Sequence, residues 1–407
     1  MRFSVSKVIF LTGIVSLFAL PSINKFILVH LFLIIALSLL IDISISKKIL
    51  INKSELVTIE LIILYFISTI IGALISKSYS GIITSFLFIL TFVFVFLAYK
   101  LNENYILIFL KGFIISAIIT SIIVYIDTFY YYLFNTPLWL KIIPEHLAQK
   151  AGDSYGAKIK YIWGIKFYRS AGLSWDPGIS MTGVTLAIVL LFEKIVNIKN
   201  LKFFLLLMFG AVILSISRTA IYALVFYFFI KSFEKVFNKI KIERTKVNLL
   251  TILAFIIIVI FLNIGIFIEY NNASQGTERH LKYFSSLYYF YKQNFFEFLF
   301  GYGYTGVGIF FNKYVDWLYN VKGFYFKPDL NPESTLTNIW FYGGLVGSFF
   351  WIYLFFKILL HSIDNIKIVF LILILLSFGY AINSVWFNAI LFVLIFWKEK
   401  NFQKQLL

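Results

Sequence analysis

Arginine is the residue type whose placement in this chain first indicates chemistry. The sequence has 36 basic residues, and only five of them are arginine: Arg2, Arg169, Arg218, Arg244 and Arg279. Arg2 and Arg244 lie in basic stretches, whereas the other three lie in polar segments beside apolar sequence. A guanidinium keeps its charge and donates two hydrogen bonds to one phosphate group, so these three arginines predict recognition of an oxyanion. The alternative for each is a pairing with a carboxylate or a side chain that extends to the membrane surface.

Two of these arginines belong to short polar motifs. The first motif, residues 169–178, reads Arg-Ser-Ala-Gly-Leu-Ser-Trp-Asp-Pro-Gly and leads directly into an apolar run, with Asp176 before the proline. The second motif, residues 215–219, reads Ser-Ile-Ser-Arg-Thr and interrupts apolar sequence that extends from 203 to 230. An arginine there costs a few kcal/mol unless it faces a polar cavity, so the second motif predicts a functional role for Arg218.

The third motif consists of Arg279 and the glycine-rich segment 300–308, which an aromatic amphipathic stretch separates. The glycines match the spacing of a dinucleotide-binding loop, but that loop requires a preceding buried strand in a βαβ unit, which the sequence does not predict. The glycines therefore predict a close approach of the backbone to a ligand or to a neighbouring helix.

The fourth motif, residues 333–347, begins with Glu333 directly after a proline and ends in Gly-Gly-Leu-Val-Gly. A carboxylate in the first turn of a helix complements the helix dipole. The competing interpretation of Glu333 is a general base.

Apolar runs must position these motifs. Hydrophobic residues make up 61% of the chain and charged residues 14%, which predicts an all-α polytopic membrane protein. Runs of roughly 20 apolar residues are needed to cross the hydrocarbon core. We expect about twelve transmembrane helices, at 8–20, 26–45, 56–75, 82–99, 106–126, 179–193, 203–217, 219–231, 249–268, 336–356, 368–382 and 385–397.

The distribution of lysine and arginine predicts the orientation of these helices. Basic residues are frequent in alternate short loops, which places both termini on the inner side. The expected division is five N-terminal transmembrane helices, a first outer loop, helices six to nine, a second outer loop, and helices ten to twelve with a cytoplasmic tail, at 1–126, 127–178, 179–268, 269–335 and 336–407. The first loop opens on an aromatic run, residues 128–134, that we expect to form an interfacial helix.

The net charge of +17 is dispersed over loops that flank the membrane, so the expected counterpart is anionic lipid and not nucleic acid. The chain has no cysteine, and its four histidines are too far apart in sequence to indicate a metal cluster.

Taken in order, the four motifs resemble those of the bacterial superfamily of O-antigen polymerases and O-antigen ligases, which are polytopic glycosyltransferases. The resemblance covers roughly residues 165–350. It implies a GT-C-like fold in the inner membrane, with the two long loops and the active site facing the periplasm. It also implies a metal-independent, inverting-type transfer without a cofactor, from a glycan on undecaprenyl diphosphate. By this resemblance Arg169, Arg218 and Arg279 bind the diphosphate and stabilise the charge that develops on it.

The fourth motif departs from the ligase pattern, because ligases have a histidine where this chain has Glu333. The departure favours a polymerase that extends the glycan onto a second lipid-linked repeat unit, with Glu333 or Asp176 activating the acceptor hydroxyl. A chain-length-regulating protein is a candidate partner. The alternatives are an O-antigen ligase that uses lipid A core as acceptor, and a lipid-linked oligosaccharide flippase or other transporter. Transporters have internal repeats and broken helices, and the sequence predicts no such repeat.

Overall fold

The computed structural model describes residues 5–17, 23–46, 51, 53–138, 159–162, 165–170, 172, 177–240, 253, 293–304, 335–359, 365–377 and 385–406. Compact packing divides the chain into two units. Unit 1 comprises Met1–Lys47, Val93–Ser232 and Ser384–Leu391, and unit 2 comprises Lys48–Phe92, Phe233–Asn383 and Phe392–Leu407.

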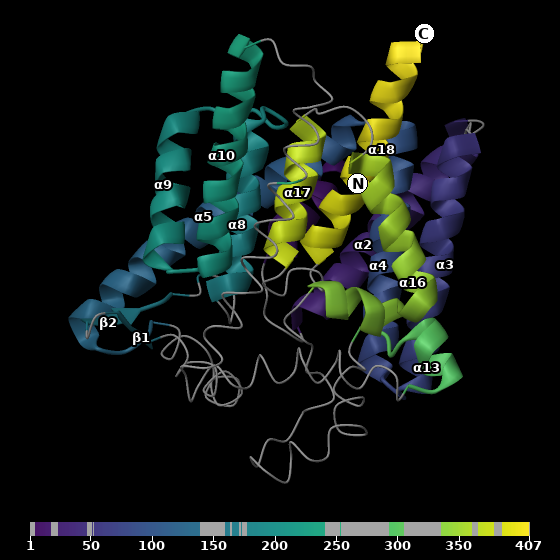
Figure 1. Cartoon of the computed structure of the whole chain (residues 1–407), viewed down its shortest axis with the longest axis horizontal. Coiled ribbons are helices and arrows are strands. Elements are labelled where there is room, and N and C mark those ends of the chain that lie inside the picture. The colour runs from purple at the N-terminus through teal and green to yellow at the C-terminus, as the bar shows by residue number, and fades with distance from the viewer. Residues whose placement is uncertain are drawn as a thin grey trace. The chain divides into compact units, whose positions relative to one another are not determined.

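Helices account for most of the described chain, because an apolar segment in lipid must satisfy its own backbone hydrogen bonds. Each of the expected transmembrane runs overlaps a described helix, apart from 249–268, which lies outside the described residues but for Leu253. The helices are α1 (Val5–Ser16), α2 (Ile23–Ser46), α3 (Lys53–Ile75), α4 (Tyr79–Leu101), α5 (Asn104–Phe134), α8 (Pro177–Phe192), α9 (Leu201–Leu214), α10 (Arg218–Ile240), α13 (Phe295–Phe300), α16 (Thr335–Leu359), α17 (Asn365–Ser377) and α18 (Val385–Leu406) (Figure 1).

Three segments of the described helices have the length and composition to cross a membrane: Glu55–Ile75, Tyr79–Leu101 and Asn104–Phe134. The predicted class, an all-α membrane protein, is confirmed in this general form. The number of crossings and their orientation stay predictions, as does the division of the chain into topological segments.

In unit 1, α1 crosses α5 with their backbones in close contact. Gly13 and Gly112 face the opposing helix, and a Cβ atom at Gly13 would collide with the carbonyl oxygen of Phe109. A Cβ atom at Gly112 would collide with the carbonyl oxygen of Phe10. Small residues at such a crossing let helices associate by van der Waals packing in lipid, where apolar burial supplies little drive.

The start of the predicted first outer loop differs from the expected interfacial helix. Residues 128–134 are helical, but they form the last turns of α5, which ends where Asn135 adopts a left-handed conformation with φ 56°. The helix continues because the sequence from 127 to 134 contains no glycine, proline or asparagine that would end it. Phe129, Tyr132 and Phe134 at this end are exposed, as aromatic side chains in a headgroup layer are.

The first loop also contains a β-hairpin that we did not expect from the sequence. Strands β1 (Ile159–Ile162) and β2 (Ile165–Tyr168) pair in antiparallel register, with Ile159 opposite Tyr168 and Ile162 opposite Ile165. Each strand has one lysine among apolar and aromatic residues, and in the sequence a glycine at 164 lies between the two strands, which is typical of a hairpin. The second strand leads directly into the first motif.

Unit 2 is built around α3 and α16, which pack against each other and against α13. α16 is broken at Gly344, whose φ of 57° and ψ of −151° are not helical. The third and fourth motifs meet at this break.

Candidate functional site

A buried carboxylate, Asp127 of α5, holds the first motif. Its side chain is fully buried and accepts three hydrogen bonds. Oδ2 accepts from the Tyr168 hydroxyl at 2.8 Å and from the Ser170 hydroxyl at 2.6 Å, and Oδ1 accepts from the backbone N–H of Leu138 at 3.0 Å. We call these four residues the Asp127 clasp. The clasp ties the residues on both sides of Arg169 to the end of α5.

Two further contacts fix the same segment on α5. The Tyr168 ring stacks on the Tyr131 ring, with centroids 4.1 Å apart and an angle of 11° between the planes. The backbone N–H of Tyr168 donates to the Tyr132 hydroxyl at 3.4 Å. Aromatic stacking of this kind contributes roughly 1 kcal/mol of stability beyond that of the buried area. The backbone is therefore held in place on both sides of Arg169.

Gly172 of the first motif adopts a backbone conformation that favours glycine. Its φ is 59°, and a Cβ atom there would lie 2.7 Å from Thr120 Cγ2 and 3.1 Å from the Thr120 carbonyl oxygen. Its N–H donates to the Ser170 hydroxyl at 3.2 Å. The glycine therefore allows the chain to pass directly over α5.

Replacing Gly172 by alanine is expected to lower the free energy of unfolding by about 3 kcal/mol, because the left-handed conformation and the collision with Thr120 both oppose it. Unfolding in a denaturing detergent, followed by tryptophan fluorescence, would measure the change. Adding Thr120→Ser removes the colliding methyl group but leaves the conformation, so it should restore part of the loss. Equal stability of Gly172→Ala and the wild-type protein would contradict the close approach.

The structure brings the first and second motifs together. Arg169 is half-buried, and its Nε atom donates to the carbonyl oxygen of Ser215 at 2.9 Å. Ser215 follows α9, and Arg218 is exposed at the first position of α10. Both motifs thus lie at one end of unit 1, where α8 and α10 begin.

The turn between α9 and α10 has an unusual backbone. Ile216 adopts φ 49°, which is a rare conformation for a β-branched residue. Strain of this kind costs on the order of 1–2 kcal/mol and persists only where surrounding contacts determine it. Here the carbonyl of Ser215 is bonded to Arg169 and that of Ser217 to Ile221 N–H, which holds the tight turn. The start of α10 and the arginine guanidinium are both groups that bind anions.

The third and fourth motifs meet within unit 2. The N–H groups of Tyr302 and Gly303 donate to the carbonyl oxygens of Phe341 and Tyr342, at 2.6 Å and 3.2 Å. These carbonyls belong to the half of α16 that precedes the break at Gly344. A break in a helix leaves backbone carbonyls without their usual donors within the helix. Here the N–H groups of the third motif donate to them instead.

Glycines make this packing possible. A Cβ atom at Gly303 would lie 2.7 Å from the backbone nitrogen of Ala73 on α3, and a Cβ atom at Gly344 would lie 2.6 Å from the nitrogen of Gly301. The φ angles of Gly301 and Gly303 are 72° and 71°. The predicted close approach of this glycine segment to a neighbouring helix is confirmed.

Tyrosines fill the space beside these glycines. Tyr304 and Tyr65 are buried, and the Tyr304 hydroxyl donates to the Tyr65 hydroxyl at 2.8 Å. Burial, followed by the nearby Tyr65 hydroxyl, raises the pKa of Tyr304 well above its usual range, so Tyr304 stays protonated as a donor. Both side chains belong to the buried core of unit 2.

The sequence-predicted site residues fall into two groups. Arg169 and Arg218 are described and lie in adjoining motifs, whereas Asp176, Arg279 and Glu333 lie outside the described residues. Asp127 is a site residue that the sequence analysis missed. It is an acidic residue within an apolar helix, a pattern that by default indicates function. We overlooked it because the expected helix ended at 126. Among the described residues, no group of three histidine or acidic side chains is placed to hold a metal ion.

Comparisons with known proteins give no relative: no family model matches the chain, and neither a curated protein nor a solved structure matches it.

Proposed function

We propose that this chain is an O-antigen or related surface-polysaccharide polymerase, a glycosyltransferase of the inner membrane. It transfers a growing glycan from undecaprenyl diphosphate to the non-reducing end of a second lipid-linked repeat unit. The observation that supports the proposal best is the hydrogen bond from Arg169 to the carbonyl of Ser215, which joins two arginine-containing motifs at one end of unit 1.

The arginines supply the charge that this reaction requires. The acceptor hydroxyl attacks the anomeric carbon of the donor glycan, and the bond from that carbon to the diphosphate oxygen breaks. Negative charge then accumulates on the leaving diphosphate, and fixed guanidinium groups stabilise it without reorganising. In this scheme Arg169, Arg218 and Arg279 bind the diphosphate.

The proton of the acceptor hydroxyl passes to a carboxylate. The two candidates are Glu333 of the fourth motif and Asp176 of the first motif, and the one that acts as the base carries this proton after the attack. Asp127 is not a candidate, because its carboxylate is fully buried and already accepts three hydrogen bonds. Its role in the scheme is to hold the first motif.

The proposal includes the membrane arrangement that the reaction needs. Twelve helices cross the inner membrane, both termini are cytoplasmic, and the arginine motifs face the periplasm, where the lipid-linked repeat units are joined. Donor and acceptor are both oligosaccharides on undecaprenyl diphosphate, membrane lipids surround the helices, and a chain-length-regulating protein is a further partner. No step uses a metal ion or a cofactor.

The broken helix α16 is the described feature that comes nearest to the transporter alternative. In transporters the groups freed by such a break face a cavity and bind the cargo. In this chain the carbonyls of Phe341 and Tyr342 are bonded to the third motif instead. The break therefore serves the packing of the third motif against α16, and it does not favour the transporter alternative.

The decisive experiment supplies the purified protein with an undecaprenyl-diphosphate-linked repeat unit alone and resolves the products on a gel. A ladder of longer lipid-linked chains is expected. Transfer only after lipid A core is added would assign the chain as a ligase. No product in either assay, together with uptake of the lipid-linked unit into the lumen of vesicles, would assign a flippase.

A further inference from the structure

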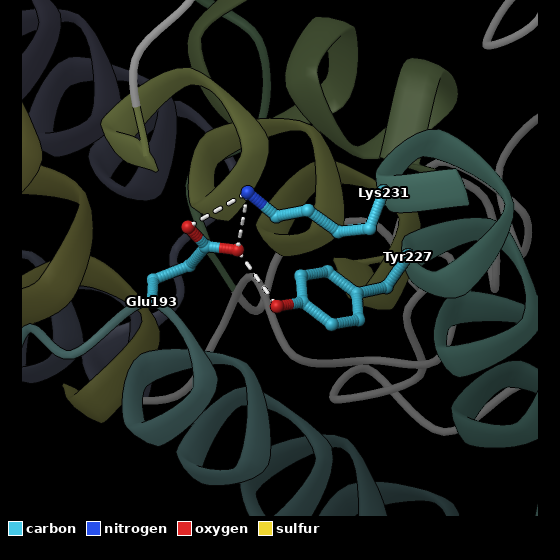
Figure 2. A network of polar contacts seen from close by, with 3 residues as sticks. All are labelled: Glu193, Tyr227 and Lys231. Atoms are coloured by element: carbon cyan, nitrogen blue, oxygen red, sulfur yellow. Dashed lines mark hydrogen bonds and ion pairs between the residues drawn. The ribbon is translucent and has the colours of Figure 1, made fainter. Parts of the chain in front are cut away.

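Unit 1 contains a second polar cluster, formed by Glu193, Tyr227 and Lys231. Figure 2 shows how these three side chains lie. Glu193 accepts a hydrogen bond from the Tyr227 hydroxyl at 2.7 Å, through Oε1. Lys231 Nζ lies 2.9 Å from Oε1 and 3.0 Å from Oε2 of the same carboxylate. The Glu193 side chain is 2% exposed and the Lys231 side chain 31%. We call these three residues the polar clamp.

The polar clamp joins the far ends of two helices whose near ends carry the arginine motifs. Glu193 directly follows α8, which starts at Pro177 within the first motif. Tyr227 and Lys231 lie on α10, which starts at Arg218 of the second motif. At about 1.5 Å per residue, Lys231 lies about 20 Å along α10 from Arg218. α8, α9 and α10 stand side by side in Figure 1.

Stability alone does not account for the polar clamp. Glu193 is buried although Lys231 is partly exposed, and replacing an ion pair with a buried member by well-packed apolar side chains is often neutral or stabilising. The C-terminal end of α8 also carries the negative end of the helix dipole, which disfavours a carboxylate there. A fold that only needed α8 and α10 to adhere would do so through apolar contacts, which are present: the Phe192 ring lies 5.9 Å from the Tyr227 ring and 5.7 Å from the Phe228 ring.

The polar clamp allows only one alignment of α10 along α8, which we call the register of α10. Tyr227 and Lys231 are four residues apart, so they lie on the same face of α10 and reach one carboxylate together. Sliding α10 by one turn, about 5.4 Å, would take at least one donor away from Glu193 and leave a buried charge short of partners. The aromatic contacts are less directional and tolerate such a slide.

We infer that the polar clamp is a positioning device that fixes the register of α10 against α8, and thereby the position of Arg218 relative to Arg169. The role of those arginines in the reaction rests on the proposed function; the register itself does not. Glu193, Tyr227 and Lys231 are positioning residues and touch no substrate.

The test uses the full chain with two introduced cysteines, which are unique because the chain has none of its own. Spin labels replace the exposed residues Ile126 on α5 and Val225 on α10, and pulsed EPR gives the distance between them. Ile126 is next to Asp127, whose clasp holds the first motif to α5. The distance between the labels therefore reports the position of α10 relative to the first motif. The labelled protein without further substitutions, which we call the labelled background, should give one narrow distribution of this distance.

The informative variant is Glu193→Leu with Lys231→Leu, which removes both charges and keeps the apolar contacts. We expect it to fold with a thermal midpoint near that of the labelled background, to show a broader distribution or a second distance, and to extend glycan at least about 10-fold more slowly, the loss expected from a misplaced catalytic group. The exchanged pair, Glu193→Lys with Lys231→Glu, should restore the narrow distribution. A single narrow distribution in the double leucine variant would overturn the inference.

The distance and the activity separate the two proposals. A changed distance with unchanged glycan extension would support the polar clamp and count against the catalytic role of Arg218. An unchanged distance would refute the polar clamp and leave the proposed function to its own assay. Glu193→Gln, which keeps an acceptor for Tyr227 but loses the ion pair, should give a distribution between those of the background and the double leucine variant.

Discussion

Replacing Arg218 by alanine is expected to reduce glycan extension by about 100- to 1,000-fold, the loss that follows removal of one fixed donor to a developing anion. Arg218 is exposed at the start of α10, so its loss opens no cavity and should leave the fold intact. The measurement is the rate of ladder formation from the lipid-linked repeat unit, with each variant at equal concentration and shown to be monodisperse in detergent.

Two matched variants make this result specific. Arg218→Lys keeps the positive charge but loses the fork that contacts two oxygens at once, so it should recover only part of the rate. Lys199→Ala removes an exposed positive charge just before the start of α9, whereas the second motif follows the end of α9. This variant protein should extend glycan at nearly the wild-type rate. A near-normal ladder from Arg218→Ala would remove Arg218 from the reaction.

The helices were predictable from the sequence, because burial in lipid makes hydropathy and helix formation nearly the same signal. Helix ends were less predictable. The end of α5 at Asn135 depends on the first residue that tolerates a left-handed conformation, and hydropathy alone suggested an end at 126. The hairpin β1–β2 was visible only as two short runs of β-branched and aromatic residues, each with one lysine, separated by two residues.

The motifs were predictable as positions and not as contacts. Glycine spacing in the third motif indicated a close approach, but the partners, α3 and the broken α16, are far away in sequence. Asp127 bonds to Tyr168 and Ser170, which lie beyond most of the first loop. Glu193 likewise contacts Tyr227 and Lys231, although the whole of α9 lies between them in the sequence. Such pairings depend on how helices stack, and a single sequence carries no local signal of them.

The second large effect is expected at Asp127. Asp127→Ala leaves the N–H of Leu138 and the hydroxyls of Tyr168 and Ser170 without their acceptor in a buried site, and each such loss costs about 1–3 kcal/mol. Because hydroxyls can rotate towards other acceptors, we expect a total loss of about 4 kcal/mol in the free energy of unfolding. Detergent unfolding followed by tryptophan fluorescence would measure it.

Two further variants separate the Asp127 clasp from general damage to α5. Thr128→Val alters the next buried polar side chain, whose hydroxyl has no hydrogen-bond partner among the described residues, so it should be nearly neutral. Asp127→Asn keeps one acceptor oxygen and should cost about half as much as alanine, since the amide nitrogen cannot accept the remaining donors. If Asp127→Ala unfolds no more easily than Thr128→Val, the clasp does not hold the first motif. If instead Asp127→Asn stays folded but extends glycan about 10-fold more slowly, the clasp acts through Arg169, whose neighbours Tyr168 and Ser170 it fixes in place.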